Sequence, residues 1–95
     1  MAYTSPDILA GNNIRKLAIE CKTSKEKTKY LEKEEIADLK KFASIFGAEP
    51  WIAVRFDREE WYFLALDDIK ETESNYAISL ENAKSRGLLF EELIK

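Results

Sequence analysis

Histidine is absent from this 95-residue chain, and cysteine occurs once, as Cys21. Zinc sites and histidine-based nucleophile relays depend on these side chains, so the sequence excludes both kinds of site. A single cysteine also excludes an internal disulfide. No apolar run is long enough to span a membrane, and no signal peptide is recognisable. We therefore expect a cytoplasmic protein with no membrane partner.

Repeats and low-complexity linkers are also absent, which predicts a single domain over residues 1–95. The length is close to the common size of one domain. Hydrophobic residues make up 45% of the chain and aromatic residues 12%, which is enough to build a core. Because strand-like and helix-like segments follow one another, we expect an α/β fold.

The net charge of −3 argues against DNA binding when it is read as one number. The distribution of charge reverses this inference. Residues 15–33 contain seven basic and three acidic residues, so this segment carries +4 and the remainder of the chain −7. Such a concentration is typical of a path for a phosphate backbone. It predicts DNA contacts at Lys22, Lys25, Lys27 and Lys29. The alternative is a solvated, mobile loop from Thr23 to Lys29.

Two acidic residues and a lysine stand in a pattern that a metal-dependent nuclease needs. Asp7 follows Pro6 and opens an apolar run, and Glu20 and Lys22 stand two residues apart. Residues 15–23 alternate like a strand, so Glu20 and Lys22 project from the same face. The apolar side chains between them then point to the other face and into the core.

Turn-forming residues at 11–13 allow the two runs to fold back as a hairpin, which brings Asp7 beside Glu20. These carboxylates and a backbone carbonyl, that of Cys21, form a hard oxygen site suited to Mg²⁺ or Mn²⁺. Lys22 could stabilise charge on a phosphate or orient the attacking water. The alternative is a charged pair on a solvated strand face, although Glu-x-Lys occurs only once in this chain.

Periodicity predicts four further elements. Residues 33–46 form a helix, residues 50–56 and 60–66 form strands, and Ser79 is placed to cap a short helix at 80–86. The long helix carries one apolar stripe, which we interpret as core packing and which consists of Ile36, Leu39, Phe42, Ala43 and Phe46.

In the strand predicted at 50–56, the alternation of polar and apolar residues indicates which side chains share one face of the sheet. Arg55 alternates away from Val54 and Phe56, which predicts that it lies on the open face with Glu20 and Lys22. The alternative is an ordinary arginine on the surface of a strand.

Three aromatic residues, Trp51, Trp61 and Phe63, share one parity on neighbouring strands. If the helix at 33–46 does not cover that face, these side chains would be exposed to water. Burying them against a second copy of the chain removes the problem, so we expect a homodimer with this interface.

An ordered series of short blocks runs through almost the whole chain and is much more specific than the nuclease motif alone. The blocks are PDILAGN at 6–12, LAIECK at 17–22, YL at 30–31, FASIFGA at 42–48, WIAVRF at 51–56, WYF at 61–63 and GLLFEELI at 87–94. In this order they resemble the archaeal Holliday junction resolvase family, a branch of the restriction-endonuclease-like nucleases.

The resemblance implies a restriction-endonuclease-like fold with a central mixed sheet flanked by helices. It implies a Mg²⁺-dependent endodeoxyribonuclease that cuts four-way DNA junctions as a symmetric dimer. Asp7 and Glu20 would hold the metal, Lys22 would act on the phosphate, and Arg55 matches a basic position that contacts DNA or supports the site.

Family members begin with a helix and a strand that precede the motif aspartate, and that helix supplies an acidic and a basic residue to the site. Here six residues precede Asp7, residues 1–5 cannot supply a helix, and no residue matches those positions. The resemblance therefore implies an N-terminally truncated domain with weak metal binding and slow or no turnover. Two alternatives stay open: a module that binds branched DNA without cutting it, and a structural subunit with vestigial nuclease residues.

Overall fold

The computed structural model describes residues 6–11 and 14–95. The expectation that residues 1–5 form no helix lies outside the described residues, and so does most of the turn predicted at residues 11–13. In the described part of the chain, no helix combines the length and the apolar character needed to span a membrane.

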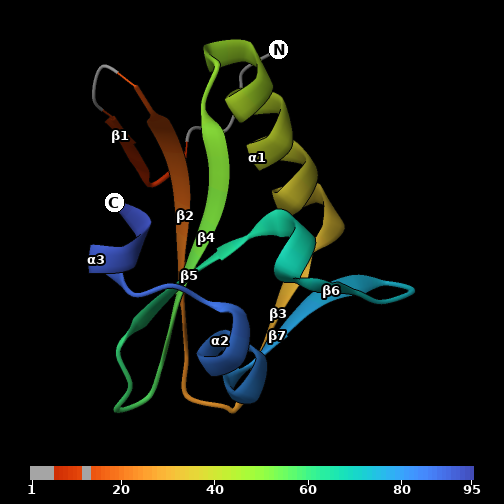
Figure 1. Cartoon of the computed structure of the whole chain (residues 1–95). Coiled ribbons are helices and arrows are strands. Elements are labelled where there is room, and N and C mark those ends of the chain that lie inside the picture. Colours follow the sequence, from red (N-terminus) through yellow and green to blue (C-terminus); the bar gives the residue numbers. More distant parts are fainter. Residues whose placement is uncertain (1–5, 12–13) are drawn as a thin grey trace.

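A four-stranded mixed sheet forms the centre of the molecule (Figure 1). Its strands, in spatial order, are β1 (Ile8–Gly11), β2 (Lys16–Ser24), β4 (Glu49–Phe56) and β5 (Trp61–Ala65). The two outer pairs are antiparallel, and the central pair of β2 and β4 is parallel. The parallel pair requires a crossover connection, which contains the long helix. The predicted mixed sheet is confirmed.

A second, smaller sheet consists of β3 (Thr28–Glu32), β7 (Asn75–Ser79) and β6 (Lys70–Glu71), with antiparallel pairing throughout. Because β2 continues to Ser24 and β3 begins at Thr28, only residues 25–27 form the turn between them. The lysine-rich loop is therefore shorter than the one considered from the sequence, and Lys29 belongs to a strand.

Helix α1 (Lys33–Phe46) has the predicted bounds. Its apolar stripe is buried, apart from Phe46 at the end, which is half exposed. Gly47 ends the helix with a φ of 65°, a left-handed conformation that glycine adopts without steric cost. Figure 1 shows α1 along one side of the central strands, with α3 (Phe90–Leu93) on the other side.

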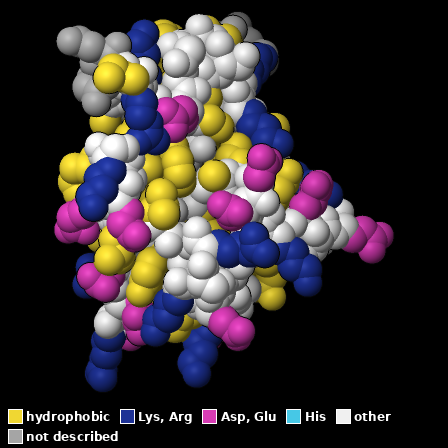
Figure 2. Space-filling view, in the orientation of Figure 1, with side chains coloured by type: hydrophobic (Ala, Val, Ile, Leu, Met, Phe, Trp, Pro, Cys, Tyr) yellow, Lys and Arg dark blue, Asp and Glu magenta, His cyan; other side chains and the backbone are white. Residues whose placement is uncertain are grey.

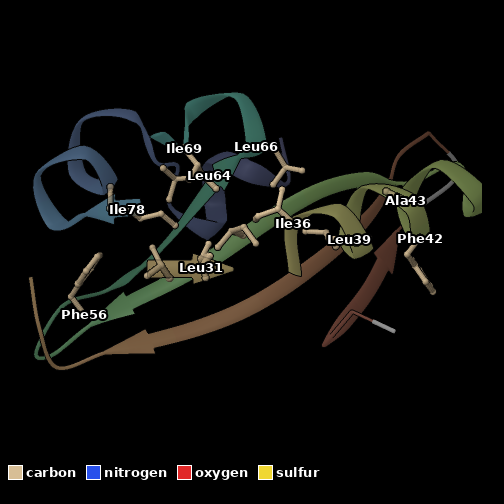
Figure 3. Packing of buried hydrophobic residues seen from close by; sticks show 14 residues of the cluster. Leu31, Ile36, Leu39, Phe42, Ala43, Phe56, Leu64, Leu66, Ile69 and Ile78 are labelled. Atoms are coloured by element: carbon tan, nitrogen blue, oxygen red, sulfur yellow. The ribbon is translucent and has the colours of Figure 1, made fainter. Parts of the chain in front are cut away.

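Alternate residues of the central strands enter two separate cores. Val54 and Leu64 face α1 and the smaller sheet, and Figure 3 shows Leu64 in the same layer as Ile36 of the helix and Leu31 of β3. The opposite face packs against α3 through a second cluster, whose buried members are Leu17, Ile19, Ala53, Phe63 and Leu93. Burial on both faces explains the apolar runs at 17–19 of β2 and 51–54 of β4.

The predicted strand at 60–66 ends one residue early, because Leu66 to Asp68 form a 3₁₀ turn. The predicted cap of the short helix is confirmed. Ser79 precedes α2 (Leu80–Arg86), and its hydroxyl accepts a hydrogen bond of 3.0 Å from the backbone N–H of Asn82.

Ser79→Ala is expected to lower the free energy of unfolding by about 1 kcal/mol, because one N–H at the start of α2 loses its partner. Urea unfolding followed by circular dichroism measures the change. Ser44→Ala, at an exposed position within α1, is the control and should leave stability equal or slightly higher, since alanine is the better helix former. Equal stability of the two variants would contradict the role of the cap.

Candidate active site

The hairpin of β1 and β2 brings Asp7 beside Glu20. The register pairs Ile8 with Ile19, so Asp7 is the next residue along the edge of β2. The Oδ2 atom of Asp7 accepts a hydrogen bond of 2.8 Å from the backbone N–H of Cys21. The arrangement predicted from the sequence is thus present, and a backbone contact holds the aspartate in place.

Glu20 and Lys22 lie on the face of β2 that is turned toward α1, as alternation predicts. Ala18, on the same face, is fully buried in the core beneath α1. The ammonium of Lys22 lies 3.7 Å from Oε2 of Glu20 and donates a hydrogen bond to Oε1 of Glu35. Glu35 belongs to the first turn of α1. The site therefore contains three carboxylates and one amine.

Glu35 was not predicted as a site residue. Its position in the sequence indicated only that it favours the start of a helix. Glu35 lies 13 residues after Lys22, and neither helix nor strand periodicity relates two side chains that are so far apart in the sequence. Their contact depends on the path of β3, which returns the chain so that α1 begins beside β2.

The local environment changes the pKa values of these groups in different directions. Burial raises the pKa of Glu20, and the charge of Asp7 raises it further, while Lys22 opposes both effects. Burial acts to lower the pKa of Lys22, but the hydrogen bond to Glu35 and the surrounding carboxylates outweigh it and raise the pKa. Glu35 has a lowered pKa, because the Lys22 ammonium and the Glu32 N–H more than offset its burial. Lys22 is therefore a cation within an acidic cluster.

The donor atoms at this site fit a small divalent cation. Asp7 and Glu20 supply two carboxylates, and the charge of Asp7 adds to burial in raising the pKa of Glu20. The N–H of Cys21 points to the Asp7 edge of β2, and the carbonyl of the same residue shares that edge in an extended strand. Within the described residues, no cluster of three or more acidic, cysteine or histidine side chains has the geometry of a metal site. Two carboxylates are nevertheless what Mg²⁺ commonly uses, with water filling its other positions.

The predicted DNA-binding lysines lie on β2, in the turn that follows it and on β3. Lys25 and Lys27 stand exposed in the turn at 25–27. Lys29 is close enough to Glu35 to help lower the pKa of that carboxyl. The positive charge therefore continues from Lys22 toward the turn that joins β2 to β3.

The prediction that places Arg55 on the face of Glu20 and Lys22 is wrong. In the parallel register Arg55 pairs with Thr23, whereas Lys22 pairs with Val54. Arg55 thus lies on the opposite face of the sheet, where its guanidinium donates a hydrogen bond of 3.1 Å to the carbonyl of Glu59. Alternation gave the correct relation between Arg55 and its own neighbours, but it could not relate the faces of two different strands.

The three aromatic residues lie on one face, as predicted, and α1 covers the other. Phe63 pairs with Ala53 and Trp61 with Arg55, and Trp51 has the same orientation. Phe63 and Trp61 border an apolar groove of about 580 Å³, lined also by residues of β1, β2 and α3. Trp51 lies outside this groove, half-buried, and its indole N–H donates a hydrogen bond to Glu49. Figure 2 shows hydrophobic side chains reaching the surface near α3.

Comparison with known proteins identifies the family. Residues 2–95 match the family model described as archaeal Holliday junction resolvase (Hjc). The chain belongs to this resolvase family. Three relatives named crossover junction endodeoxyribonuclease Hjc show that it is a family of nucleases. The one from Archaeoglobus fulgidus is 38% identical over 97 residues, which cover 95% of this chain and 71% of that protein.

The other two resolvases come from Methanocaldococcus jannaschii and Sulfolobus acidocaldarius, with identities of 35% and 34%. The matches cover 93% and 95% of this chain and 65% and 63% of those proteins. The solved structure of the Archaeoglobus fulgidus resolvase superposes with a TM-score of 0.92 at 36% identity, over 100% of this chain and 83% of that one. The resolvase fold expected from the sequence blocks is thereby confirmed.

Proposed function

We propose that this chain is a Mg²⁺- or Mn²⁺-dependent endodeoxyribonuclease that cuts four-way DNA junctions as a homodimer. The observation that carries the proposal is the convergence of Asp7, Glu20 and Lys22 at one edge of β2, in a chain of the resolvase family. A nuclease that processes chromosomal DNA junctions would act in the cytoplasm.

Each residue has a distinct part in the proposed reaction. Asp7 and Glu20 would hold the cation, and the carbonyl of Cys21 lies on the same strand edge. A bound divalent ion supplies an activated water and neutralises charge on the phosphate. Lys22, kept cationic by its acidic neighbours, would stabilise the negative charge that develops on the phosphate oxygens. The lysines at 25–29 would contact phosphates of the DNA backbone next to the site.

A second candidate is a module that binds branched DNA without cutting it. The observation that favours it is the number of acidic metal ligands: within the described residues, Asp7 and Glu20 are the carboxylates at the strand edge, and Glu35 is engaged by Lys22. Such a module would use the same lysines for binding but would leave the phosphodiester intact.

Incubation of the purified protein with a labelled four-way junction separates the two candidates. The proposed nuclease cuts the junction in the presence of Mg²⁺ or Mn²⁺ and leaves it intact in EDTA, and it leaves a linear duplex of the same sequence uncut. A binding module retards the junction in a native gel under both conditions and cuts nothing. Cleavage that persists in EDTA would overturn the proposed dependence on metal.

The proposed dimer rests on the apolar groove of the sheet face opposite α1. The rim of this groove includes Ile8, Phe90 and Ile94, which keep 44%, 54% and 55% of their surface exposed, and Trp61, which keeps 36%. Exposed apolar side chains gathered around one groove make this face a candidate interface. A second copy would bury it, and a twofold axis would relate two active sites to the two strands of a near-symmetric junction.

Trp61→Asp is expected to weaken dimerisation at least about 30-fold, because a charge replaces an aromatic side chain at the proposed interface. Light scattering coupled to size exclusion, at micromolar concentrations, measures the effect. Tyr30→Asp, on an exposed position of β3 away from the groove, is the matched control. A parent chain that is monomeric at these concentrations would refute the dimer, and an unchanged Trp61→Asp variant would refute this interface.

A further inference from the structure

Glu35 is held rigidly at the start of α1. One carboxylate oxygen, Oε1, accepts the hydrogen bond from Lys22, and the other, Oε2, accepts one of 2.9 Å from the backbone N–H of Glu32. The next residue, Ile36, is 1% exposed and anchors this turn in the core. Both carboxylate oxygens of Glu35 therefore have a hydrogen-bond partner.

Lys22, in contrast, has a long and flexible side chain, whose ammonium can reach more than one partner. It is bound to Glu35 and lies 3.7 Å from Glu20. The side chains of Lys22 and Glu20 are 21% and 22% exposed, so their mutual attraction is stronger than that of a pair in open water. Without Glu35, the nearest anion for the ammonium is Glu20, the carboxylate that the proposed cation requires.

We infer that Glu35 is a positioning residue. It holds the Lys22 ammonium close to α1 and so prevents this ammonium from forming a close ion pair with the Glu20 carboxylate. This inference rests on the proposed nuclease function and adds a fourth side chain to its site. Glu35 would act through Lys22 and would touch neither the cation nor the DNA. Its loss should consequently change the rate of cleavage more than the affinity for the junction.

Glu35→Gln is expected to lower kcat for junction cleavage about 10-fold, the size of effect that supporting residues around a metal site have. Glutamine retains an oxygen that can accept the N–H of Glu32, so the helix start is preserved. Glu34→Gln is the matched control, since Glu34 stands on the same turn, exposed to solvent. Both variants remove one negative charge from this end of the helix, so any general effect on DNA affinity or KM should be equal in the two.

Glu35→Asp separates position from charge. Aspartate keeps the negative charge but is shorter by one methylene and no longer reaches Lys22. The inference predicts a loss of kcat similar to that of Glu35→Gln. A fully active Glu35→Asp variant, or a Glu35→Gln variant as fast as Glu34→Gln, would overturn it.

A second readout does not depend on cleavage. The ¹H–¹⁵N signal of an ammonium group becomes observable at low temperature when a hydrogen bond slows its exchange with water. The Lys22 signal, assigned by its loss in Lys22→Arg, should have the same position in the parent and in Glu34→Gln and should shift in both Glu35 variants, because the ammonium then pairs with Glu20. An unchanged signal in the Glu35 variants would overturn the inference. A parent chain that fails to cut the junction would refute the proposed nuclease, whereas the ammonium signal would still decide whether Glu35 orders Lys22.

Discussion

Asp7→Asn and Glu20→Gln should each lower junction cleavage at least about 100-fold and abolish measurable binding of Mg²⁺ or Mn²⁺. Loss of a residue that merely supports a metal ligand already costs about 10- to 100-fold, and these two are the carboxylates proposed to bind the ion. Asparagine at position 7 can still accept the N–H of Cys21, so the hairpin should remain folded. Lys22→Ala is expected to reduce cleavage more than it reduces metal binding.

Isothermal titration with the metal and single-turnover cleavage of the junction measure the two effects separately. Asp57→Asn is a matched control for charge, because Asp57 is exposed in the turn after β4. It should bind metal and cut DNA like the parent. Unchanged metal affinity in both carboxylate variants would refute the assignment of this metal site.

The second large effect concerns the lysines beyond the site. If Lys25, Lys27 and Lys29 each contact one phosphate, replacing all three by alanine should lower the slope of log affinity against log salt by about 2.7, since each contact contributes about 0.9 on duplex arms. At physiological ionic strength, a slope change of this size corresponds to a loss of affinity of roughly 100-fold. Binding to the junction in EDTA, measured over a range of salt concentrations, avoids interference from cleavage.

A triple variant with the same change in charge elsewhere makes the comparison specific. Lys40, Lys70 and Lys95 are exposed on α1, on β6 and at the C-terminus. Their replacement by alanine should leave most of the slope intact. Equal slopes for the parent and the Lys25/Lys27/Lys29 variant would show that these lysines are solvated surface.

Local patterns in the sequence were sufficient to predict the elements that carry the site. The apolar stripe predicts a helix from Lys33 to Phe46, and α1 has these bounds. Strand alternation places Glu20 and Lys22 on one face, and the turn residues that follow Asp7 predict the hairpin. These predictions succeeded because helix and strand periodicity and turn chemistry are properties of a few consecutive residues.

The family assignment also came from the sequence, through the order of short blocks along the chain. This order identified the resolvase fold although no single block was specific, and the match of residues 2–95 confirms it. The assignment could not show which residues gather around Lys22, because a family resemblance names positions and does not supply the local contacts of this chain.

Two features of the site were decided only by the tertiary structure. Arg55 was predicted on the wrong face, since the parity of one strand relative to another depends on the register between β2 and β4. The sequence did not predict Glu35 as a partner of Lys22, because their contact depends on where β3 places the start of α1. Periodicity within one element determines which side chains share a face, whereas long-range pairing of strands and helices determines which of those faces meet.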